Sequence, residues 1–155
     1  MKLDRADTAL LRELQRDGRA TNVELAQRVA LSESSCLRRL RQLEASGAIE
    51  RYAAILNPAA VGLPLNVFVT ITLESQSEAA LRAFEREIQA VPEVMECYLM
   101  TGSADYLVRI AVRDVADLER IHSSRLTRIP GVARVMSSIA MRQTVRRLEL
   151  PLKSD

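Results

Sequence analysis

The sequence predicts an α+β protein of two parts, in which three helices precede a duplicated strand–helix–strand unit. Two observations carry this prediction. Apolar residues recur at helical spacing over residues 1–50, and the apolar pattern of residues 65–155 repeats itself at an offset of 38 residues. A run containing Asn, Pro and Gly at 57–64 marks the boundary. We therefore expect domains at 1–50 and 65–155, with a linker over 51–64 that includes a short strand.

Composition restricts the classes of protein to which the chain can belong. The 155 residues are 48% hydrophobic and 27% charged, so we expect a buried core rather than disorder. Two cysteines and one histidine are too few for a Cys/His metal site. The N-terminus has acids where a signal peptide would be apolar, and no apolar run approaches the ~20 residues of a membrane span. These features predict a soluble, cytoplasmic protein with reduced thiols.

Charge is nearly balanced in both parts of the chain. Residues 1–50 hold 9 Lys and Arg against 8 Asp and Glu, and residues 51–155 hold 13 against 12, so each part carries a formal charge of +1. Nucleic-acid binding would therefore require positive charge gathered locally on one surface.

The first two helices are expected at 4–17 and 21–29. Leucines three or four residues apart form one apolar stripe of the first helix, and Asp4 can cap its start. Thr21 and Glu24 have the spacing of a capping box at the start of the second helix.

A third, longer helix is expected between Ser32, its natural N-cap, and Gly47. On a helical wheel, Cys36, Leu37 and Leu43 fall within about 60° of Leu40, which predicts that these four residues form the buried side. A short capped helix followed by a tight turn and a longer helix is a helix-turn-helix pattern. The outward side carries no acid and consists of Ser34, Ser35, Arg38, Arg39, Arg41, Gln42 and Ala45.

This outward side has the chemistry of a DNA contact. Arginine can pair with guanine edges or with phosphates, and serine adds further hydrogen bonds. The alternative is an ordinary solvated face, but such a face usually mixes acids among its bases. We expect DNA contacts from Ser34, Ser35, Arg38, Arg39 and Arg41.

The second part is expected to fold as a ferredoxin-like βαββαβ sandwich. Phe68 falls over Tyr106, and the segment 91–94 (VPEV) falls over 129–132 (IPGV), so two strand–helix–strand units follow one another. Both helices would cover one face of the sheet, and dimerisation would bury the other. The expected strands are 65–74, 94–101, 105–113 and 132–142, and the expected helices are 77–90 and 114–128.

Three other segments carry expectations of their own. Residues 48–56 have β character and could form a small wing or a linker strand, and residues 142–152 read as a terminal strand that returns to the domain or to a partner subunit. His122 is expected to be partly buried or interfacial. With a single histidine and no catalytic or phosphate-loop motif, the chain is not expected to be an enzyme.

A turn is expected between the second and third strands, in the segment MTGSADYL at 100–107. Backbone NH groups around Gly102 could receive a carboxylate and Asp105 could receive an ammonium, as a zwitterionic ligand would require. The alternative is a plain hairpin in which Asp105 is only a turn residue.

These segments resemble the Lrp/AsnC, or feast/famine, family of transcriptional regulators. The resemblance runs from LDRADTALLRELQRDGR through NVELAQRVALSESSCLRRLRQLEASGAIERYAAILNP to GSADYL, IPGVARVMSS and LPL, so it covers nearly all of the chain. It implies an N-terminal winged helix-turn-helix that binds double-stranded DNA. It also implies a C-terminal RAM domain that forms homodimers, which assemble to tetramers or octamers, and that binds an amino-acid effector.

The resemblance also implies an effector site between dimers. Its residues would be Thr101, Gly102 and Asp105, with Ser137 and Ser138 nearby. Ala104 departs from the family pattern, because many members have an aromatic residue there. The alternative function is therefore an architectural protein that wraps DNA with little or no effector response.

Overall fold

The computed structural model describes residues 2–152 and divides the chain into two compact units. The first unit runs to Ile55 and includes the segment from Thr144 onward, and the second runs from Leu56 to Gln143. The division thus falls near the expected linker, but the last residues belong with the first unit rather than with the second. Over residues 2–152, no helix is both long and apolar enough to cross a membrane.

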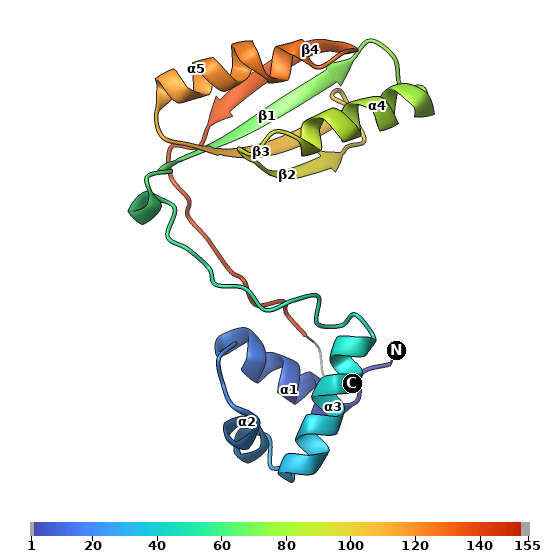
Figure 1. The fold of residues 1–155 in the computed structure, drawn as a ribbon, viewed down its shortest axis with the longest axis vertical. Helices are drawn as coiled ribbons and strands as arrows, with labels where there is room; N and C mark the ends of the chain where they lie inside the picture. The colour runs from blue at the N-terminus through green and yellow to red at the C-terminus, as the bar shows by residue number, and fades with distance from the viewer. Residues whose placement is uncertain (1, 153–155) are drawn as a thin grey trace. The chain divides into compact units, whose positions relative to one another are not determined.

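The first unit contains three helices, α1 (Arg5–Arg16), α2 (Asn22–Arg28) and α3 (Glu33–Ala45) (Figure 1). Side-chain caps start each of them, as the sequence predicts. Asp4 accepts from the backbone NH of Asp7, Thr21 from that of Glu24, and Ser32 from that of Ser35. The helices enclose a small core of Leu10, Leu11, Leu25, Ala26, Cys36, Leu40 and Leu43.

The end of the chain packs on α1 of this unit. Leu152 lies against the core cluster, and its carbonyl accepts a hydrogen bond of 2.6 Å from Arg12. Gln15 pairs with the backbone of Leu150 through both atoms of its side-chain amide. The terminal strand expected over 142–152 does not form, because a helix face offers no strand edge for pairing.

The short strand expected within residues 48–56, as a small wing or a linker strand, is also absent. The segment is unpaired, because the described residues of the first unit contain no strand with which it could pair. Tyr52 is fixed instead by donating its hydroxyl to Glu44 at 2.9 Å. Partial burial, with this carboxylate, raises the pKa of Tyr52 to about 12. A 3₁₀ turn, η1 (Ala59–Val61), follows in the second unit.

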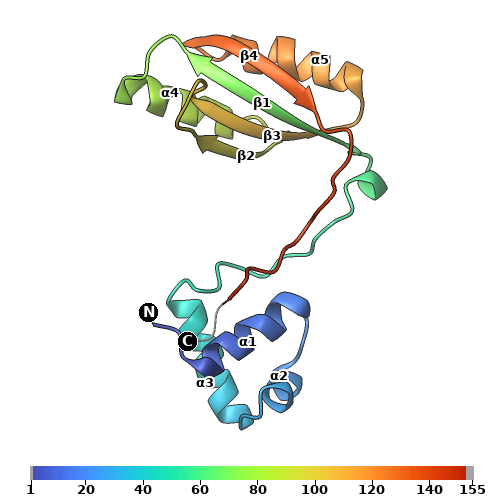
Figure 2. The ribbon, with the colours of Figure 1, turned by 180° about the vertical axis from the view of Figure 1, so that it is seen from behind.

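The second unit is the expected ferredoxin-like sandwich. Its strands β1 (Leu65–Leu73), β2 (Val94–Leu99), β3 (Tyr106–Val112) and β4 (Val132–Ile139) pair antiparallel in the order β2-β3-β1-β4. Helices α4 (Glu78–Gln89) and α5 (Val115–Ser124) cover the same face of this sheet (Figures 1 and 2). The helix expected to reach residue 128 ends early, and its last turn is the 3₁₀ segment η2 (Leu126–Arg128).

The duplication is real, but its offset differs between strands. β1 buries Val67 and Ile71 where β3 buries Tyr106 and Ile110, which is an offset of 39. Phe68 therefore faces away from the helices although Tyr106 faces them, and the expected equivalence of these two residues was wrong. A slip of one residue moves every side chain of a strand to the opposite face. Because the loop from β1 to α4 is longer than that from β3 to α5, the two units lose strict periodicity.

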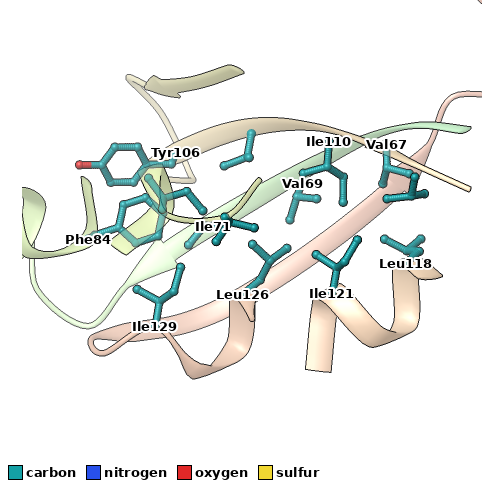
Figure 3. Close-up of a cluster of buried hydrophobic side chains, with 14 of the residues drawn as sticks. Val67, Val69, Ile71, Phe84, Tyr106, Ile110, Leu118, Ile121, Leu126 and Ile129 are labelled. Carbon is teal, nitrogen blue, oxygen red and sulfur yellow. The ribbon is translucent and has the colours of Figure 1, made fainter. Parts of the chain in front are cut away.

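One core fills the space between the sheet and its two helices (Figure 3). The rings of Phe84 from α4 and Tyr106 from β3 meet with their centroids 4.4 Å apart. At the α5 end, Leu118 and Ile121 lie against the sheet (Figure 3). This packing leaves only one face of the sheet for contacts with other molecules.

We expect Ile121→Ala to destabilise the second unit by about 2–5 kcal/mol, because Ile121 is fully buried and the variant leaves a cavity. Val115→Ala is the matched control on the same helix. Its side chain is 61% exposed, so the expected change is within about 0.5 kcal/mol. Urea unfolding followed by hydrogen exchange of the β1 amides measures both. Equal losses in the two variants would contradict the assigned packing.

Candidate nucleic-acid interface and effector site

Helix α3 has a buried side that is narrower than the sequence suggests. Cys36 and Leu43 are fully buried and Leu40 nearly so, and all three pack in the core with residues of α1 and α2. Burial raises the pKa of the Cys36 thiol, which fits its expected role as a core residue. These three contacts set the rotation of α3 about its own axis and hence the residues that it presents to solvent.

Leu37 does not belong to this buried side. Its side chain is 39% exposed and lies outside the core cluster, so the expectation that it packs inward was wrong. The reason is geometric. Cys36, Leu40 and Leu43 are centred about 35° to one side of Leu40, which places Leu37 about 95° from that centre.

Arg39 lies on one flank of α3 and binds the start of α1. Its Nη1 is 2.7 Å from Asp4 Oδ2 and 2.7 Å from Asp7 Oδ1, and its side chain is only 21% exposed. The pKa of Asp4 is held below its usual value by the Asp7 backbone NH and by this guanidinium. The expectation that Arg39 points outward with the other arginines is therefore not met, because its charge is used within the unit.

The outward side of α3 is a shallow surface hollow with donors and acceptors at its rim. Arg38 donates to the side-chain oxygen of Gln42 at 3.2 Å, so the two side chains are held together. Ser34 lies one turn earlier, with its hydroxyl 3.3 Å from that of Ser32. Six residues line the hollow, and none is acidic: Ser34, Leu37, Arg38, Arg41, Gln42 and Ala45.

The arginines of this outward side differ from Arg39 in being available. Within residues 2–152, no ion pair joins Arg38 or Arg41 to a carboxylate. Ser35 lies between the two sides, half-buried, with its backbone NH engaged by the Ser32 cap. Of the five expected DNA contacts, the structure thus brings Ser34, Arg38 and Arg41 to one surface and directs Arg39 elsewhere.

The turn between β2 and β3 holds the other candidate site. The Met100 backbone NH donates to the carbonyl of Asp105 at 2.8 Å, which closes the turn. Gly102 has φ +125°, a conformation that other residues rarely adopt, and both Thr101 and Gly102 are exposed. Asp105 Oδ2 accepts from the backbone NH of Leu73 at 2.7 Å, so this carboxylate also ties the turn to the end of β1.

Ser137 and Ser138 do not join this turn. Both lie on β4, which is separated from β3 by β1. Ser137 pairs in register with Val69 on the helix-covered face, whereas Ser138 pairs with Phe68 on the open face. The two serines therefore face opposite sides of the sheet, and within one chain the structure does not bring them together with Asp105.

The open face of the sheet is a mixed apolar and charged surface. Phe68, Tyr98 and Met136 are exposed on it to between 38% and 58%. At its centre Arg109 pairs with Glu96 at 2.8 Å, which lowers the pKa of that carboxyl. Exposed aromatic side chains around one internal ion pair are typical of a surface that is covered by another protein.

Comparison with known proteins assigns both units. Residues 3–50 match the family model described as winged helix-turn-helix DNA-binding, and residues 66–150 match the Lrp/AsnC ligand binding domain. The leucine-responsive regulatory protein of Escherichia coli K12 is 39% identical over 152 residues, which cover 98% of this chain and 93% of that protein. The chain belongs to the Lrp/AsnC family. It is a transcriptional regulator with a helix-turn-helix DNA-binding unit and a ligand-binding unit.

Solved Lrp/AsnC structures have the same fold over nearly the whole chain. A transcriptional regulator from Neisseria meningitidis, in complex with L-Met, is 37% identical and superposes with a TM-score of 0.92, covering 97% of each chain. An AsnC family regulator from Agrobacterium tumefaciens gives 37% identity and a TM-score of 0.91, covering 96% of this chain and 97% of the other.

We expect Arg39→Ala to lower the melting temperature of the first unit by roughly 2–6 °C, because it removes the link between α3 and the α1 start. Arg38→Ala, the matched control one position away, should leave that temperature unchanged, since Arg38 hydrogen-bonds a surface glutamine one turn along the same helix. Differential scanning calorimetry compares the two. A loss in Arg38→Ala as large as that in Arg39→Ala would refute the distinction between these arginines.

Proposed function

We propose that this Lrp/AsnC regulator reads operator DNA with the outward side of α3, through Ser34, Arg38, Arg41 and Gln42. The observation that carries the proposal is the acid-free hollow that these residues line. An α-helix fits the major groove, where arginine pairs with guanine and glutamine with adenine. Arg39 is left out of the contact set because its guanidinium binds Asp4 and Asp7.

A dimer is part of this proposal. Residues 1–50 have a net charge of only +1, so the three-helix segment supplies little non-specific attraction to DNA. Two units that are linked through their second halves would gain affinity from two half-sites about one helical turn apart. The open face with Phe68, Tyr98 and Met136 is the surface that we propose for the pairing, with higher assembly to a tetramer or octamer. Binding to the chromosome would place the protein in the cytoplasm.

We expect Arg38→Ala and Arg41→Ala each to weaken operator binding by roughly 1–3 kcal/mol, because each removes a charged donor from the contact surface. Arg82→Ala is the matched control. Its side chain is 69% exposed on α4 of the second unit, and its loss should not change affinity. Anisotropy titrations on a duplex that the wild-type protein selects from random sequences measure the three variants. Unchanged affinity in both α3 variants would contradict the assignment of these DNA contacts.

The effector in this proposal is an amino acid, and the turn around Gly102 is its site. The relative from Neisseria meningitidis was solved with L-Met, and the curated relative is named for leucine. The exposed turn offers backbone NH groups for a carboxylate, and Asp105 offers negative charge for an ammonium. Thr101, Gly102 and Asp105 form this proposed site, and within one chain Ser137 and Ser138 on β4 do not join it.

We expect Asp105→Asn to lower amino-acid affinity at least tenfold. The asparagine oxygen can still accept from the Leu73 NH, so the turn is kept while the charge is lost. Ser138→Ala should leave affinity unchanged, as a variant of the open face. Isothermal titration of the wild type and both variants with each of the twenty amino acids measures this. Equal effects of the two substitutions would refute the site, and a wild type that binds no amino acid would favour architectural DNA wrapping.

A further inference from the structure

Leu37 is an exposed apolar residue on the outward side of α3, and neither the core of the first unit nor a hydrogen bond accounts for its position. The side chain is 39% exposed, although Cys36 and Leu40 of the same helix are buried in the core. Its neighbours on the helix surface are Ser34, one turn before, and Arg41, one turn after. An apolar side chain thus sits within the polar surface proposed to enter the major groove.

The major groove of DNA presents one apolar group to such a side chain. Each base pair shows a set of donors and acceptors there, and thymine adds the C5-methyl group. A helix that places its hydrogen-bonding side chains against base edges also brings the side chains that lie between them close to the bases. Leu37, next to Arg38 in sequence and one turn before Arg41, is held where a thymine methyl would meet it.

We infer that Leu37 is a specificity-determining residue that contacts the C5-methyl of a thymine in each operator half-site. The inference rests on the proposed DNA contact of α3 and adds a base preference to it. Three features of this chain support the assignment. The residue lies outside the core, the hollow around it contains no carboxylate, and Arg38 is held by Gln42 rather than folded over the leucine.

The size of the effect follows from the group that is removed. Replacing thymine by deoxyuridine deletes one methyl and leaves every hydrogen-bonding group of the base pair in place. Loss of one buried methyl corresponds to about a fourfold change in affinity. The same loss should not occur when the leucine is absent, because the methyl then has no apolar partner on the protein.

The experiment is a double-mutant cycle between protein and DNA, using full-length protein and a duplex selected by the wild type from random sequences. Each thymine of one half-site is replaced in turn by deoxyuridine, and affinity is measured by fluorescence anisotropy. For the wild type, one position should cost about fourfold. For Leu37→Ala, the natural and substituted duplexes should bind equally at that position.

Two further variants keep the test sharp. Leu37→Met retains an apolar side chain and should retain most of the sensitivity. Val115→Ala removes an exposed apolar group from the second unit and should retain all of it. The inference is overturned if no deoxyuridine weakens the wild type, or if Leu37→Ala is as sensitive as the wild type. A wild-type protein that selects no duplex at all would instead refute the proposed function itself.

Discussion

The rotation of α3 about its own axis is the constraint on which the DNA-binding surface depends. It is set by the burial of Cys36, Leu40 and Leu43 against the first two helices. Because these residues are spaced four and three apart, they occupy one narrow arc of the helix surface. Once this arc is buried, the direction of every other side chain of α3 is fixed. Turning the helix by one residue position, about 100°, would take these three residues out of the core and bury flank residues in their place.

The remaining surface of α3 has two flanks with different roles: one stabilises the unit, and the other is proposed to contact DNA. One flank carries Arg39, whose charge is neutralised by the two acids at the start of α1. The other carries Arg38 and Arg41, which form no ion pair with a carboxylate of residues 2–152. A chain with a nearly balanced overall charge can thus keep a local positive surface, since acids such as Asp4 and Asp7 are placed at a helix start and in ion pairs with Arg39.

The second unit applies the same division to a sheet. Alternate residues of each strand face the helices or the open side. Core residues and residues of the proposed dimer surface therefore alternate along each strand. Phe68 shows how sensitive this is, because it sits between two fully buried valines and yet is exposed. The turn proposed as the effector site lies at the end of the same strands, where Asp105 accepts a hydrogen bond from the Leu73 NH of β1.

Much of this arrangement could be predicted because its causes are local. The caps at Asp4, Thr21 and Ser32 act within three residues of themselves, and the order and approximate positions of the helices and strands in the second unit follow from periodicity. The partners of Arg39 are 32 and 35 residues away in sequence, so no local pattern reveals them.

The other departures have similar physical causes. The exposure of Leu37 could have been found by requiring a narrower buried arc than the one used. The unpaired segment around Tyr52 could not, because its β pattern is satisfied only if a partner strand exists elsewhere. The docking of Leu152 on α1 depends likewise on residues at the far end of the chain.

The division of the α3 arginines is tested most directly by a crystal structure of the full-length protein bound to a selected operator duplex. We expect the guanidinium groups of Arg38 and Arg41 at about 3 Å from base edges or phosphates, with Arg39 still bound to Asp4 and Asp7. A complex in which Arg39 leaves those acids for the DNA, while Arg38 and Arg41 face solvent, would contradict it.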